Sequence, residues 1–206
     1  MDFCRIYEEI ARQIEKNAEY LDGLDAVMGD GEHGFNMKRC FNAVKDMLTE
    51  WREMDNVEIL RNAGMTLLSA GGGTASTLLG FFMKKAADAA GKKTTYDAES
   101  VAGILGEALE AALERSRAKE GDKTLMDVLI PAVRAFSEEA KNGDIHAAVK
   151  AAAEASAEGV QATEQMIAKK GRGFYVADRG IGTADPGAAS LNLIIQVIHK
   201  EILKEV

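Results

Sequence analysis

The stretch LDAVMGDGEHGFNM occupies residues 24–37 and places three carboxylates, Asp25, Asp30 and Glu32, within eight positions. Glycines lie between and after these acids, and glycine permits the tight turns that bring neighbouring side chains together. Hard divalent cations such as Mg²⁺ bind carboxylate oxygens that converge on one point. A solvated acidic turn is the alternative, but the apolar flanks (Leu24, Val27, Met28, Phe35 and Met37) favour a turn held against a core. We therefore interpret the stretch as a metal or phosphate site.

Apolar residues recur every three or four positions on both sides of this stretch, which is typical of amphipathic helices. A first helix is expected over residues 3–21, and a second carries the apolar series Met37, Phe41, Val44, Leu48 and Trp51. Asp55 followed by Glu58 predicts a capping box at the start of a third helix.

The same periodicity continues to the C-terminus without an alternating strand pattern. Further helices are expected over 78–90, from Asp97, after 121–124, and over 144–170, with the last opened by Asp185 as N-cap and Pro186. The predicted fold class is all-α, a bundle of about eight antiparallel up-and-down helices. One domain is expected over residues 1–206.

Composition limits the classes of partner. The chain has 206 residues, of which 47% are hydrophobic and 28% charged, as in ordinary globular proteins. Its net charge of −8 argues against nucleic acid or an anionic membrane as the main partner. A nucleotide remains compatible where metal ions and local cations reverse the field. Two cysteines without metal-ligand spacing, no signal-peptide pattern and no run of membrane-spanning length predict a cytoplasmic protein.

Four connections hold the unusual residues: 23–36, 70–77, 121–124 and 171–187. In an up-and-down bundle, alternate connections lie at the same end. Counted along the predicted helices, these four fall on one parity, so we expect them to form a single site.

Residues 70–77 resemble a phosphate cradle, because small residues leave backbone N–H groups open just before a helix N-terminus. The loop lacks the lysine of a P-loop, and close helix packing is an equal alternative. Lys123, Arg172 and Arg179 are candidate cations, of which Arg172, between two glycines, is best placed to approach a ligand. Asp185 is either a helix cap or a ligand. No Ser/His/Asp or Cys/His nucleophile arrangement can be assembled.

Together the loops resemble a known family, the nucleotide-binding L subunits of dihydroxyacetone kinases. The resemblance runs nearly end to end and rests on four ordered motifs: GDGEHGFNM at 29–37, GMTLLS at 64–69, GDKT at 121–124 and GTADPGA at 182–188.

The resemblance implies a barrel of eight antiparallel helices with the nucleotide, ADP or ATP, at one end. It implies that Asp25, Asp30 and Glu32 hold two Mg²⁺ ions that bridge the nucleotide phosphates. The residues implied to contact the nucleotide are His33, Gly34, Phe35, Asn36, Thr74, Ala75, Gly121, Arg172, Asp185, Pro186 and Gly187.

Two positions depart from the family pattern. The third metal position carries Glu32 where the family usually has aspartate, which keeps the charge and lengthens the reach. Residues 72–78 read GGTASTL where the family usually reads GGASGPL, so the loop lacks the Gly-Pro pair that would stiffen it.

The implied function is that of a Mg²⁺-dependent phosphoryl-transfer subunit for a small hydroxyketone or related sugar. The substrate would sit on a separate K-type subunit, and the phosphoryl donor would be ATP or a phosphorylated carrier protein. A nucleotide-binding regulatory adapter and the nucleotide domain of a fatty-acid kinase are the alternatives, and a homodimer remains open.

Overall fold

The computed structural model describes residues 1–204, and over that range it contains helices and no strand. The all-α prediction is confirmed. The helices are α1 (Phe3–Lys16), α2 (Ala18–Met28), α3 (His33–Trp51), α4 (Asn56–Ala70), α5 (Thr74–Ala90), α6 (Ala98–Ser116), α7 (Met126–Ala140), α8 (Ile145–Glu164), the 3₁₀ helix η1 (Arg172–Tyr175) and α9 (Pro186–Leu203). None of the described helices is both long and apolar enough to cross a membrane.

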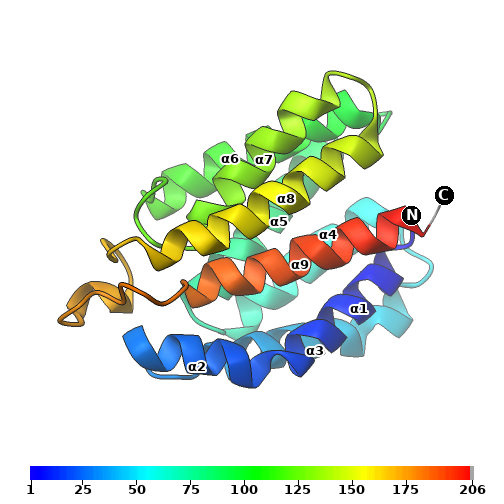
Figure 1. The fold of residues 1–206 in the computed structure, drawn as a ribbon. Coiled ribbons are helices and arrows are strands. Elements are labelled where there is room, and N and C mark those ends of the chain that lie inside the picture. Colours follow the sequence, from blue (N-terminus) through cyan, green and yellow to red (C-terminus); the bar gives the residue numbers. More distant parts are fainter. Residues whose placement is uncertain (205–206) are drawn as a thin grey trace.

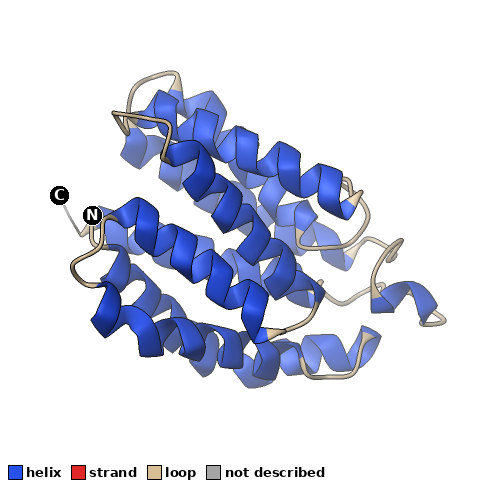
Figure 2. Ribbon diagram, turned by 180° about the vertical axis from the view of Figure 1, so that it is seen from behind, coloured by secondary structure: helices blue, strands red, loops and turns tan. Residues whose placement is uncertain are grey.

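The helices form a closed ring. From α3 to α9 each α-helix packs against the next along the chain, and α9 packs against α1, which in turn packs against α3. Figures 1 and 2 show the helix axes running up and down with short connections at both ends. Both termini lie at one end, and the segment with η1 projects from the other (Figure 1). The predicted helical barrel is thereby confirmed.

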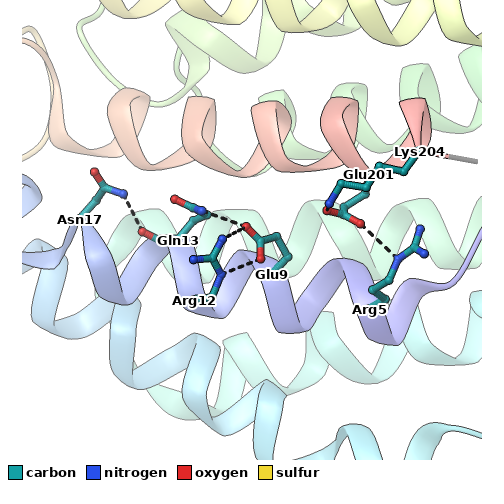
Figure 3. A network of polar contacts seen from close by, with 7 residues as sticks. All are labelled: Arg5, Glu9, Arg12, Gln13, Asn17, Glu201 and Lys204. Atoms are coloured by element: carbon teal, nitrogen blue, oxygen red, sulfur yellow. Dashed lines mark hydrogen bonds and ion pairs between the residues drawn. The ribbon is translucent and has the colours of Figure 1, made fainter.

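An ion pair between an exposed arginine of the first helix and a buried carboxylate of the last helix closes the ring (Figure 3). Glu201 of α9 is 3% exposed and receives a bond from Nε of Arg5 at 3.1 Å, with a further ion pair to Lys204. A buried carboxylate is tolerated only when its charge is compensated. This compensation fixes where α1 and α9 pass each other.

The predicted apolar stripes form the core. The five α3 residues that define its stripe are all buried, and so are the apolar residues on one face of α7. The capping box of α4 is also confirmed. The Asp55 carboxylate accepts the amide of Glu58 at 2.9 Å, and the Glu58 carboxylate accepts the amide of Asp55 at 3.4 Å.

The prediction of one helix over 3–21 and a loop over 23–36 is wrong. The helix breaks at Asn17, whose side-chain amide donates to the carbonyl of Gln13 at 2.8 Å. The chain then continues as α2 to Met28, so only residues 29–32 form the turn. Close approach explains the break, because a Cβ at Gly34 would collide with the Ala18 carbonyl.

Two further predictions need correction. The helix expected to reach about Lys170 ends at Glu164, because the amide of Ala168 turns away to the carbonyl of Arg179 at 2.9 Å. Of the apolar flanks of the acidic turn, Met28 and Met37 are buried, but Val27 and Phe35 are 44% and 59% exposed. The turn is therefore held on one side only.

A glycine crossing between α4 and α5 supports a stability prediction. A Cβ on Gly64 would lie 2.8 Å from both the Gly80 carbonyl oxygen and the Lys84 amide nitrogen. We expect Gly64→Ala to lower the free energy of unfolding by about 1–3 kcal/mol through overpacking. Gly103→Ala, where nothing lies within 4 Å, should raise it by about 0.5–1 kcal/mol through helix propensity. Urea unfolding measures the free energy of unfolding of both variants. Equal changes in the two variants would contradict a close crossing of α4 and α5 at Gly64.

Candidate functional site

The four connections that hold the unusual residues, 23–36, 70–77, 121–124 and 171–187, meet at one end of the barrel, as their parity predicts. The Nε2 atom of His33, at the start of α3, lies 3.0 Å from Oγ of Ser190 in α9. A Cβ on Gly187 would lie 3.6 Å from Cβ of Ala75, at the start of α5, and 3.3 Å from that of Leu125. In the η1 segment, Arg172 forms an ion pair with Asp30 in the acidic turn.

The acidic turn folds back on the last turn of α2. The Asp25 carboxylate accepts the amides of Gly31 at 3.0 Å and Glu32 at 3.2 Å. Gly31 has φ of +74°, a left-handed conformation that favours glycine. A Cβ at Gly29 would collide with the Asp25 carboxylate. The glycines thus allow a carboxylate on a helix to reach into the turn.

Two carboxylates of the turn, Asp25 and Asp30, are in contact, and their pKa values shift in opposite directions. Burial and a hydrogen bond shared with Asp30 raise the pKa of Asp25. The guanidinium of Arg172 lowers the pKa of Asp30. The Arg172 and Asp30 side chains are 64% and 43% exposed, so solvent screens their ion pair and it contributes little to stability.

The acids fit a hard divalent cation by the chemistry of their donors. Asp25 and Asp30 are already in contact, and Glu32 follows them at the N-cap of α3. Carboxylate oxygens are the ligands that Mg²⁺ prefers. Among residues 1–204, however, no three His, Cys, Asp or Glu side chains are gathered closely enough to hold a metal ion. A bound cation would have to compete with Arg172 for Asp30.

The start of α5 presents open backbone donors. No side chain caps this helix, and its N-cap, Gly73, has φ of +91°. The hydroxyl groups of Ser76 and Thr77 donate to the Gly73 carbonyl at 3.1 and 2.8 Å, so they do not cover the first amides. Uncapped N–H groups and the helix dipole favour an anion. Thr74 is exposed at this terminus and Ala75 is half-buried.

The 71–73 turn is short, because α5 starts at Thr74 within the predicted 70–77 loop. Arg39 of α3 clamps this turn, donating to the Gly71 carbonyl at 2.9 Å and to Oδ1 of Asn36 at 3.2 Å. Gly72 approaches α3 closely, since its Cβ would lie 3.2 Å from the Asn36 carbonyl. Hydroxyl and guanidinium contacts therefore stabilise a loop that lacks the Gly-Pro pair.

His33 joins two helix N-termini. The Ser190 hydroxyl donates to the Gly187 carbonyl at 3.0 Å, so it accepts its second bond from a protonated Nε2 of His33. Burial lowers the pKa of His33 to about 4, and the ring is neutral at pH 7. Phe35, by contrast, points its side chain into solvent and donates its amide to Oδ1 of Asp22 at 3.1 Å.

Asp185 acts as the predicted cap of α9. Its carboxylate accepts the Ala188 amide at 2.8 Å, and burial raises its pKa to about 7. Pro186 and Gly187 are buried in the first turn. Gly121 is occupied within its own loop, where its amide donates to the Asp127 carboxylate and its carbonyl accepts Nζ of Lys169 at 2.7 Å.

The segment 165–185 lies against the end of α2. Met28 anchors it, since Cβ atoms on Gly173 and Gly180 would lie 3.4 and 2.7 Å from Met28 atoms. This anchor places η1 beside the acidic turn. Of the candidate cations, Arg172 therefore reaches the acids, whereas the guanidinium of Arg179 stacks over the Phe174 ring at 4.6 Å.

The prediction that Lys123 offsets phosphate charge is not supported by its placement. Its side chain is buried and its ammonium donates to main-chain carbonyls. Sequence reasoning also missed Asp22, Arg39 and Ser190, which position the starts of α3 and α5. The carboxylate of Asp22 caps the start of α3 by accepting the amide of Phe35. Because the two residues are 13 positions apart, no local sequence pattern indicates this role.

The structure is thus an all-α barrel that brings two paired carboxylates and an uncapped helix N-terminus to one end. A profile of the DAK2 domain family matches residues 27–200. The chain belongs to this family.

Two relatives match over most of both lengths. The ADP-binding subunit DhaL of PEP-dependent dihydroxyacetone kinase 2 from Listeria innocua is 36% identical, covering 99% of this chain and 95% of the relative. The ADP-binding subunit DhaL of the PEP-dependent dihydroxyacetone kinase from Escherichia coli K12 is also 36% identical, covering 88% and 87%. Both relatives are named as subunits of kinases.

A solved structure shares the fold. The crystal structure of the dihydroxyacetone kinase of C. freundii superposes with a TM-score of 0.75 at 22% identity, covering 96% of this chain. The chain spans 34% of that larger protein. A second structure of that kinase, in complex with AMP-PNP and Mg²⁺, gives a TM-score of 0.74 at 21% identity.

Proposed function

We propose that this chain, one domain over residues 1–206, is the ADP- or ATP-binding subunit of a dihydroxyacetone-type kinase. The observation that carries the proposal is the meeting, at one barrel end, of the acidic turn with the uncapped start of α5. The names of the two relatives that match over most of their lengths support the same role.

The chain's own residues divide the work. Amides at the start of α5 bind phosphate oxygens, and Arg172 exchanges Asp30 for a phosphate group. His33 and Ser190 hold the starts of α3 and α9 together. Asp25, Asp30 and Glu32 would hold two Mg²⁺ ions, which when bound neutralise negative charge on the phosphates.

A K-type subunit carrying a small hydroxyketone is the proposed partner. Apolar side chains stand exposed around the loop end: Val27, Phe35, Ile167, Phe174, Tyr175 and Ile181. Exposed apolar groups beside a site are typical of interaction surfaces. The phosphoryl donor is proposed to be a phosphorylated carrier protein, in line with the PEP dependence named for both relatives, with ATP as the alternative.

Calorimetry of ADP binding tests the metal requirement. The acids repel the phosphates unless cations bridge them, so we expect ADP affinity with Mg²⁺ to fall by at least about 100-fold in EDTA. Adding excess Mg²⁺ back should restore binding, which controls for damage by the chelator. Equally tight binding in EDTA would rule out the two-metal arrangement.

A further inference from the structure

Lys123 carries a buried charge that the proposed chemistry does not use. The residue is 2% exposed, and its Nζ donates to the carbonyls of Thr163 and Thr183, both at 2.6 Å. Its backbone has φ of +60°. Burial of an ammonium is costly unless hydrogen bonds replace water, and left-handed conformations of non-glycine residues persist only where the surroundings enforce them.

The two carbonyls belong to segments that are far apart in the sequence. Thr163 lies in the last turn of α8, and Thr183 lies just before the N-cap of α9. Thr163 makes a second link, since its Oγ1 accepts the amide of Asp185 at 3.0 Å. One lysine and one threonine therefore join the 121–125 loop, the end of α8 and the entry to α9.

Acidic side chains around this junction offset only part of the cost of burying the ammonium. Burial lowers the pKa of Lys123, and the nearby carboxylates of Asp185, Glu164, Asp127 and Asp178 act in the opposite direction and raise it. Asp127 in turn accepts the amide of Thr124 at 2.8 Å, which fixes the loop that carries Lys123. The ammonium thus lies among several acids, and it donates its hydrogen bonds to main-chain carbonyls.

The position of α9 depends on this junction. Near the start of α9 lie Gly187, where an added Cβ would be 3.6 Å from Ala75 and 3.3 Å from Leu125, and Ser190, which is hydrogen-bonded to His33. We propose that Lys123, with Thr163, is a positioning residue that sets the start of α9 against the starts of α3 and α5 and so shapes the nucleotide site. The inference rests on the proposed function and gives Lys123 no contact with phosphate.

A matched pair at Thr163 gives the sharpest test. Thr163→Ser keeps the acceptor for the Asp185 amide, and Thr163→Val replaces it with a methyl group of similar size. We expect ADP affinity with Mg²⁺ to stay within about twofold in the serine variant and to fall about tenfold in the valine variant, equivalent to about 1.4 kcal/mol. Equal affinities in the two variants would overturn the proposal.

Lys123→Met provides the second variant, and Leu48→Ala controls for a general loss of stability. Leu48 is buried near the far end of α3. Amide hydrogen exchange without nucleotide should accelerate at residues 183–189 in Lys123→Met and Thr163→Val. It should stay unchanged there in Leu48→Ala. Similar exchange in all three variants would also overturn the proposal.

The two readouts separate this inference from the proposed function. Failure of the wild-type chain to bind ADP would contradict the proposed function. The exchange pattern of the nucleotide-free protein would still decide whether Lys123 and Thr163 hold the start of α9.

Discussion

Asp30→Ala is expected to weaken Mg²⁺-dependent ADP binding by at least about 100-fold. Mutating a residue that only hydrogen-bonds to a metal ligand already lowers metal affinity by about 10–100-fold, and Asp30 is proposed to be a ligand itself. Asp30 lies between the other two acids and contacts both Asp25 and Arg172. Without Asp30, a bound cation loses one of its carboxylate ligands, and Arg172 loses its ion-pair partner. Calorimetry with ADP and Mg²⁺ measures the loss.

The same substitution should leave the fold intact. The Arg172–Asp30 ion pair is largely exposed, and pairs of that kind contribute about 0–1 kcal/mol. Removing Asp30 also relieves the like charge that helps raise the pKa of Asp25. Asp46→Ala, at an exposed site on α3, is the matched control and should change neither affinity nor melting temperature. Normal ADP binding by Asp30→Ala would exclude Asp30 from the metal site.

Glu32 extends this prediction to the position that departs from the family pattern. A carboxylate is retained there on a longer side chain, at the exposed N-cap of α3. Glu32→Asp should therefore keep much of the affinity, and Glu32→Ala should lose most of it. If Glu32→Ala binds Mg²⁺ and ADP normally, Glu32 is not a ligand.

The fold was largely predictable because its information is local. Apolar spacing identified the stripe of α3, and Asp55 and Asp185 marked helix starts through bonds to amides a few residues away. The break at Asn17 was missed because the apolar pattern continues through Leu21 into α2. What bends the chain there is the close approach of Gly34 to Ala18, a contact between separate helices that periodicity does not encode.

The site was predictable only in part for the same reason. Loop parity placed the marked segments at one end, and the glycine turn around Asp25 was visible in the sequence. The partner of each cationic side chain could not be predicted from the sequence. Arg172 reaches Asp30 across 142 positions, and Lys123 reaches carbonyls 40 and 60 positions away. In a sequence, a lysine that binds phosphate and one that binds buried carbonyls look alike.

The chain alone is expected to phosphorylate free dihydroxyacetone at least about 1,000-fold more slowly than with a K-type subunit, because correct placement of reactants is worth effective molarities of about 10⁵–10⁸ M. In the proposed function, the loops at this end of the barrel bind phosphates and cations through the start of α5, the acidic turn and Arg172. The described site residues offer no second group of side chains to orient an acceptor hydroxyl. His33 is committed to Ser190 through its Nε2.

A coupled assay of the purified chain with Mg²⁺, dihydroxyacetone and either ATP or the phosphorylated carrier protein with ADP, repeated after adding a K-type subunit, measures the difference. Tyr175→Ser supplies a variant that separates docking from nucleotide binding, since the Tyr175 side chain is 86% exposed. It should lower the partner-dependent rate and leave ADP affinity unchanged. In-line phosphoryl transfer demands that the acceptor oxygen face the terminal phosphate, and an acceptor diffusing to an open barrel end lacks that constraint. Comparable turnover with and without the partner would place an acceptor site within this chain.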